Sequence, residues 1–214
     1  KNLIRTVIAG ARKTTDRFGV SSGTSTQFLG ARVDISNGGT MTAESIVIKL
    51  FEVAQKMDEK NVPQDGRVAI LDPATYYLLV RGDSSKIGLA VNRDWAGPAN
   101  GSISAGNIIE VAGIKILKSN HIPNTNESST QSALHGSSGV KNDVTGTTDD
   151  GYSGLDYSLT KGIAFHSDAV GTVKLMDLSV ETDYIMERLG TLMLAKYAMG
   201  HNVLREECCF ELYD

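Results

Sequence analysis

The chain has 214 residues and a formal net charge of −4, with 22 glycines and 6% aromatic residues. That length can bury one sizeable core or two small ones, and the composition is that of a globular protein with many turns. The acidic balance does not indicate a basic face for winding nucleic acid. No apolar run approaches the ~20 residues that span a bilayer, and the chain does not open with the basic and then apolar segment of a signal peptide.

The first third of the chain predicts two amphipathic helices. Apolar residues recur at helical spacing from Leu3 to Ala11, so the chain opens inside a helix. The stretch Asp16–Gly39 is rich in Gly, Ser and Thr and predicts a surface connection with one short strand around Phe28–Val33. The clearest helix runs from Thr42, which can cap it, to Asn61. Its apolar stripe comprises Ile46, Val47, Leu50, Val53, Ala54 and Met57.

The middle of the chain alternates strands and one helix. Arg67–Leu71 predicts a buried strand, and Asp72-Pro73 then begins a helix, because Asp caps and Pro fits the first turn. The core side of this helix should hold Tyr76, Leu79 and Val80, and Gly82 should end it. Asn107–Val111 and Ile114–Lys118 predict a hairpin that turns at Ala112-Gly113.

A long polar stretch separates this hairpin from the C-terminal part. Residues Asn124–Asp156 are mostly Ser, Thr, Asn, Gly and Asp, with too few apolar side chains to pack a core of their own. A loop of this length in a compact domain is either functional or disordered.

The C-terminal part is the most apolar. Gly162–Phe165 predicts a buried strand, and Ser167 or Asp168 could cap a short helix over Ala169–Leu175. Leu178 and Val180 alternate with polar neighbours, which favours a half-buried strand. Tyr184–His201 is ambiguous, since its apolar spacing fits a helical stripe and its Met, Leu and Ala content also favours a helix.

The motifs that could carry chemistry are weak. None of the four histidines, His121, His135, His166 and His201, has a metal-ligand spacing, and the two cysteines are adjacent. His166-Ser167-Asp168 holds the residue types of a catalytic triad, but neighbours in sequence rarely converge that way. His201 with Cys208 or Cys209 could form a base and nucleophile; a turn histidine and two reduced, half-buried thiols is the plainer interpretation.

Several short runs share an order with a known family. Val62-Pro63, Arg67-Val68 and Asp72-Pro73 precede Tyr76; Ala169-Val-Gly-Thr-Val-Lys-Leu is followed by Asp177-Leu178 and Glu181; and Ala195-Lys-Tyr-Ala-Met-Gly-His is followed by Leu204-Arg205-Glu206. Their order resembles the C-terminal part of the major capsid proteins of short-tailed, T-seven-like (podovirus and cyanophage type) bacteriophages. The family usually has Pro after the Leu-Arg pair, where this chain has Glu206.

The resemblance implies an α+β fold, that of tailed-phage major capsid proteins, with a peripheral and an axial domain. Residues 1–61 would hold the end of the spine helix, a connection and the first helix of the axial domain. Residues 62–180 would form the axial domain at the capsomer centre, with a long loop at 124–156. Residues 181–214 would return to the peripheral domain, and the family places long antiparallel strands at 184–201. The N-terminal arm and the extended loop would lie upstream of Lys1.

The implied function is structural rather than enzymatic: self-assembly into hexamers and pentamers of an icosahedral phage head, with no cofactor and no metal. The implied partners are other copies of the chain, a scaffolding protein, a portal protein and packaged double-stranded DNA, which an acidic chain would contact weakly and without sequence specificity. The protein would be made in the bacterial cytoplasm and reside in the virion. Two alternatives are an encapsulin-like compartment shell and an enzyme that uses His201 with Cys208 or Asp72.

Overall fold

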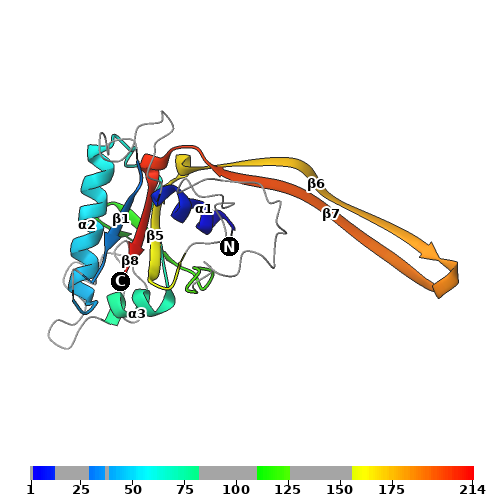
Figure 1. The fold of residues 1–214 in the computed structure, drawn as a ribbon, viewed down its shortest axis with the longest axis horizontal. Coiled ribbons are helices and arrows are strands. Elements are labelled where there is room, and N and C mark those ends of the chain that lie inside the picture. Colours follow the sequence, from blue (N-terminus) through cyan, green and yellow to red (C-terminus); the bar gives the residue numbers. More distant parts are fainter. Residues whose placement is uncertain (1, 13–28, 37–38, 82–109, 126–155) are drawn as a thin grey trace.

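The structure is a computed structural model that describes residues 2–12, 29–36, 39–81, 110–125 and 156–214. Figure 1 shows a body of helices around a sheet, from which one long two-stranded arm projects. The elements are α1 (Asn2–Ala11), β1 (Ala31–Asp34), α2 (Ala43–Glu59), β2 (Arg67–Leu71), α3 (Pro73–Arg81), β3 (Glu110–Val111), β4 (Ile114–Lys118), β5 (Thr160–His166), β6 (Val170–Ile185), β7 (Gly190–Val203) and β8 (Cys209–Tyr213). Short 3-10 turns lie at Ser167–Ala169, Met186–Arg188 and Glu206–Cys208.

The central sheet has six strands in the order β1-β8-β5-β2-β4-β3. Strand β8 runs parallel to β1 and antiparallel to β5, which in turn runs antiparallel to β2. Strands β2 and β4 are parallel, and β3 and β4 pair as an antiparallel hairpin. The C-terminal strand therefore lies inside the sheet, between a strand from the first 34 residues and one that begins at Thr160.

Helix α2 confirms its sequence prediction in detail. Thr42 Oγ1 accepts a hydrogen bond from the Ser45 N–H (3.1 Å), and Ser45 Oγ accepts one from the Thr42 N–H (3.0 Å), which closes a capping box. The predicted apolar stripe faces inward: Ile46, Leu50, Val53, Ala54 and Met57 are buried, and Val47 is partly buried. Local signals sufficed here because cap and stripe act within one helix.

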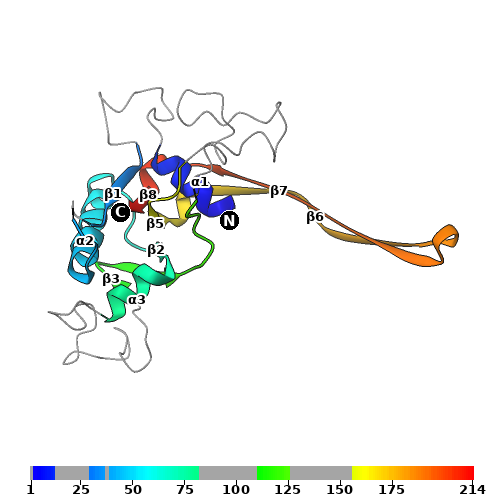
Figure 2. The same ribbon diagram turned by 60° about the horizontal axis from the view of Figure 1, so that its bottom comes forward.

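Helices α1 and α2 lie on opposite sides of the central sheet (Figures 1 and 2). Helix α1 presents Ile4, Val7, Ile8 and Ala11 to the core, as the spacing predicted, whereas Leu3 at its start is exposed. It comes very close to β8 and to the entry of β1, since a Cβ at Gly30 would lie 2.6 Å from Ala11 Cα and 2.7 Å from the Cys209 carbonyl oxygen. Glycine at this position is therefore required for the packing of the first helix on the last strand.

The other predicted elements of the body are found with small differences. Strands Arg67–Leu71 and Ile114–Lys118 match their predictions, and the turn between β3 and β4 has Ala112 and Gly113 at positive φ. The short strand expected around Phe28–Val33 begins later, at Ala31. In α3, Tyr76 and Leu79 are buried, whereas Val80 is only partly buried. Gly82, most of the 107–111 strand and most of the 124–156 stretch lie outside the described residues.

The predicted helix over Ala169–Leu175 is wrong. A 3-10 turn at Ser167–Ala169 leads directly into strand β6. The cap also differs, because the His166 side chain, rather than Ser167 or Asp168, accepts the hydrogen bond from the Asp168 N–H. The segment is extended because Val170, Gly171 and Thr172 pair with Val203, Asn202 and His201 of β7.

The ambiguity of Tyr184–His201 resolves as strands, as the family resemblance implied. Residues up to Ile185 belong to β6, and Gly190–Val203 form β7, joined by a turn in which Leu189 is left-handed (φ 49°). Two details of the predictions are wrong. Leu178 and Val180 are exposed rather than half-buried, and Cys208 and Cys209 are fully buried rather than half-buried.

Candidate assembly interface

The residues proposed for an enzyme are not arranged for catalysis. Cys208 and Cys209 form no disulfide and have no exposed surface, and burial raises the pKa of the Cys209 thiol above its ordinary value. A raised pKa opposes the thiolate form that a nucleophile needs. His201 is paired in β7 with Thr172, whose Oγ1 lies 2.8 Å from its Nδ1. The backbone of Asp72 makes two hydrogen bonds: its N–H donates to the Lys161 carbonyl, and its carbonyl accepts from the Tyr76 N–H.

The His166-Ser167-Asp168 run is a structural turn. The Asp168 N–H donates to His166 Nδ1 (3.2 Å), and Nε2 lies 2.8 Å from the Asp65 carbonyl oxygen. Both ring nitrogens are therefore engaged by the backbone and neither is free to take a proton from Ser167. Within the described ranges, no group of three or more His, Cys, Asp or Glu side chains could hold a metal ion. No helix in those ranges is long and apolar enough to cross a bilayer.

The most distinctive surface is the antiparallel hairpin of β6 and β7, called the arm below. It pairs from Val170 with Val203 at the base to Ile185 with Gly190 at the tip, with register shifts between Lys174 and Ser179. It extends away from the body in both ribbon views (Figures 1 and 2). A two-stranded hairpin alone is at best marginally stable in water, so an arm of this length needs a covering partner.

The two faces of the outer arm differ in charge. Residues directly opposite each other in an antiparallel pair lie on the same face, which assigns the faces from the register. The uncharged face comprises the pairs Val180–Ala195, Thr182–Met193 and Tyr184–Thr191. The charged face comprises Ser179–Lys196, Glu181–Leu194 and Asp183–Leu192, with Lys196 Nζ 2.8 Å from a Glu181 carboxylate oxygen.

Large apolar side chains on the arm are strongly exposed. Leu175 is 85% exposed, Leu189 83%, Met186 79% and Met193 69%. Further exposed apolar side chains along it are Val173, Leu178, Val180, Tyr184, Leu192, Leu194, Tyr197 and Met199. So many exposed apolar side chains on one hairpin are typical of a protein interaction site. The arm is therefore a candidate interface with another protein molecule.

The base of the arm is tied to the body by polar contacts. Where β6 begins, the Ala169 carbonyl accepts from the Leu204 N–H (2.9 Å). Arg205, where β7 has ended, places Nε 3.0 Å from a Glu207 carboxylate oxygen and Nη1 3.8 Å from Asp168. Both strands are thus held together as they leave the body.

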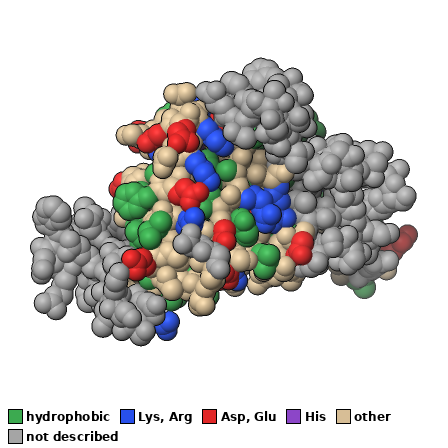
Figure 3. Space-filling model, turned by 60° about the vertical axis from the view of Figure 1, so that its left-hand side comes forward, with side chains coloured by type: hydrophobic (Ala, Val, Ile, Leu, Met, Phe, Trp, Pro, Cys, Tyr) green, Lys and Arg blue, Asp and Glu red, His purple; other side chains and the backbone are tan. Residues whose placement is uncertain are grey.

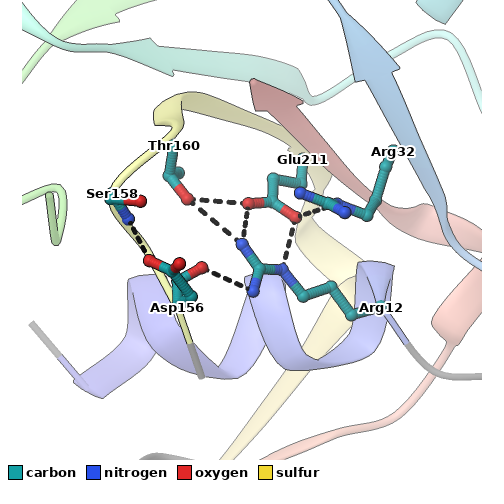
Figure 4. A network of polar contacts seen from close by, with 6 residues as sticks. All are labelled: Arg12, Arg32, Asp156, Ser158, Thr160 and Glu211. Carbon is teal, nitrogen blue, oxygen red and sulfur yellow. Dashed lines mark hydrogen bonds and ion pairs between the residues drawn. The ribbon is translucent and has the colours of Figure 1, made fainter. Parts of the chain in front are cut away.

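A buried carboxylate joins Arg12, which directly follows helix α1, to three strands of the central sheet (Figure 4). Glu211 of β8 is fully buried and accepts from Arg12 through both carboxylate oxygens, with Arg12 Nε at 2.6 Å. Arg32 Nε of β1 lies 2.8 Å and Thr160 Oγ1 of β5 2.7 Å from the same carboxylate. Arg12 Nη1 also donates to the Asp156 carbonyl (2.8 Å). Two guanidinium groups and a hydroxyl satisfy this buried charge, which is the condition for its stability.

Comparisons with known proteins give one consistent match. The family model for Gp10A-like major capsid proteins matches residues 1–213. The major capsid protein of Escherichia phage T7 is 26% identical over 167 residues, which cover 77% of this chain and 45% of that protein. The T7 minor capsid protein is also 26% identical and is covered to 39%.

Solved structures agree with this match. The capsid structure of the cyanophage P-SCSP1u aligns with a TM-score of 0.73 and 30% identity over 99% of this chain and 60% of the other. The mature capsid of bacteriophage PhiM1 aligns with a TM-score of 0.66 at 17% identity, covering 99% and 58%, which shows a shared fold. The chain spans about half the length of the curated relatives it matches.

Sequence reasoning missed both the exposure of the arm and the buried Glu211. A strand that alternates apolar and polar residues has the same sequence pattern whether its apolar face is covered by its own chain or by another molecule. Glu211 is 199 residues from Arg12, so no local pattern links them.

Proposed function

Because the chain belongs to the Gp10A-like family of major capsid proteins, we propose that it assembles into hexamers and pentamers that form an icosahedral phage head. The head encloses double-stranded DNA and is made in the bacterial cytoplasm. The tailed-phage capsid fold and the family membership indicate a structural rather than an enzymatic role.

The observation that carries this proposal is the arm. Its exposed apolar side chains, Leu175, Leu189 and Met193 among them, would aggregate or be covered, and a closed shell covers such surfaces by repetition. Each subunit then meets several neighbours at once, so modest individual contacts add up to a stable particle.

The division of the chain into domains remains part of the proposal. Residues 1–61 would supply the end of the spine helix and the first axial helix, 62–180 the axial domain, and 181–214 the return to the peripheral domain. The described sheet draws strands from all three ranges, since β1 and β8 pair with each other and β8 pairs with β5. The division therefore describes places in a shell rather than separately folding units.

The proposed partners are a scaffolding protein, a portal protein and the packaged DNA. Contact with DNA would be weak and independent of sequence, since the chain carries 21 Lys and Arg against 25 Asp and Glu. The thiol of Cys208 is fully buried, so a substrate could not reach a His201 and Cys208 pair.

Electron microscopy of the complete protein co-expressed with its scaffold tests the proposal. We expect closed shells of uniform size with the scaffold and irregular or no shells without it. Monomers or small defined oligomers at all concentrations would refute the capsid proposal. Scaffold-free shells around one specific protein would instead support an encapsulin-like compartment.

A further inference from the structure

The outer face of α2 carries an apolar and acidic groove. Ile48 is 55% exposed and Phe51 57%, and Ala112 of the β3–β4 turn borders them. The groove has a volume of about 710 Å³, and its charged lining residues are Glu52, Asp58 and Glu59. Seen from this side of the molecule, hydrophobic and acidic side chains lie next to one another (Figure 3).

The charge of the groove is concentrated at Glu59. Glu52 is held by Lys49 and Lys56, both at 2.8 Å, and Asp58 by Arg67 at 2.6 Å. Glu59 instead accepts from the neutral amide of Gln55 (2.8 Å). Among the ion pairs of the described residues, none neutralises Glu59, so its carboxylate can bind a cationic side chain of another molecule.

A different face, on α3 and β4, has the opposite character. Tyr77 is 52% exposed, and Lys118 Nζ lies 2.9 Å from its hydroxyl oxygen and 4.8 Å from its ring centroid. These contacts hold the ammonium group in one place and raise the pKa of Lys118 above its ordinary value. Beside it, a hollow of about 280 Å³ is lined by Ala74, Tyr77, Leu78, Val80 and Arg81. This face is aromatic and basic.

We propose that the α2 groove of one copy receives the α3–β4 face of the next copy around a capsomer ring. The two faces are complementary, since each has exposed apolar side chains and one is acidic while the other is basic. They are also different surfaces of one chain, and a contact between different surfaces is heterologous and generates rings when it closes. This inference rests on the proposed capsid function.

The test uses charge reversals in the complete protein co-expressed with its scaffold. Glu59→Lys and Lys118→Glu should each remove capsomers and shells, because each places like charges across every ring contact. The Glu59→Lys/Lys118→Glu double variant restores an opposite-charge pair at every contact and should restore closed shells. Asp65→Lys, an exposed reversal in the turn before β2 and outside both faces, is the matched control and should assemble normally.

Mixing the two single variants distinguishes a ring contact from a two-fold contact. In an alternating ring of six, every contact is either the native pair or the swapped pair, so mixed samples should show six-membered capsomers by electron microscopy. A ring of five cannot alternate, so pentamers and closed shells should stay rare in the mixture. Thermal melting of each unassembled variant checks folding. Phe51→Ser tests the same contact without a charge change and should also remove capsomers.

The inference is overturned if either single reversal assembles like the wild type, or if the double variant does not restore shells. Loss of assembly in Asp65→Lys would also overturn it, since any reversal would then suffice. If the wild type itself forms no shells, the capsid proposal fails and this inference fails with it. That outcome differs from the others because it involves the unmodified protein.

Discussion

The buried Glu211 offers the sharpest test of how the body is held together. In Glu211→Gln the side chain keeps its shape and loses its charge. Arg12, whose side chain is only 11% exposed, would then be left as an uncompensated buried cation, whereas Arg32, at 41%, can be hydrated. Removing one partner of a buried ion pair destabilises a protein by about 3–5 kcal/mol. The amide keeps one accepting oxygen, so we expect the lower end, about 3 kcal/mol.

For a chain of this length, each kcal/mol lowers the melting temperature by about 2–4 °C. Glu211→Gln should therefore lower it by roughly 6–12 °C, measured by circular dichroism on unassembled protein. The same substitution at Glu181 is the matched control. Its ion pair with Lys196 has the same kind of contact at 2.8 Å but lies exposed on the arm, where such pairs contribute under about 1 kcal/mol. Equal shifts in the two variants would refute the reasoning, since burial would then not decide the strength of the pair.

Three further results are expected. Met193→Glu should leave the melting temperature of the unassembled protein unchanged, because the side chain is 69% exposed. It should abolish shells, because each copy would lose about 1.5–3 kcal/mol of stabilisation from burying the Met193 side chain and would bury a charge instead. Normal shells would show that this face of the arm is not covered in the particle. Reductant should change neither melting nor particle integrity, because Cys208 and Cys209 form no disulfide. A drop in the melting temperature of the particle would contradict this. Burial lowers the pKa of Lys60 to about 8 from 10.5, so the unfolded chain binds more protons between these values and stability should rise with pH from 8 to 9. Denaturant titrations of Lys60→Met should lack that part of the rise, and an unchanged pH slope would exclude a role for Lys60.

The sequence alone determined the elements whose causes are local. Helix α2 follows from a cap at Thr42, a stripe three and four residues apart, and a stop at Pro63, all within the helix or a few residues from its ends. Strands Arg67–Leu71 and Ile114–Lys118 follow from short apolar runs beside turn residues. The family could also be inferred, because the order of the short runs from Val62 to Glu206 is a property of the sequence and does not depend on knowing the fold.

The tertiary structure decided what depends on partners far away in the chain. Tyr184–His201 has the composition of a helix, yet its part in β7 is extended, because every residue of β7 except Tyr197 pairs across the arm with a residue of β6. These partners lie up to 33 residues away, as Val203 does from Val170 at the base. Glu211 carries a buried charge because Arg12, Arg32 and Thr160 converge on it from three other elements. The exposed arm and the two complementary faces of the body are likewise properties of shape. Periodicity shows that a side chain seeks cover, but only the folded chain shows which side chains it has left for other molecules to cover.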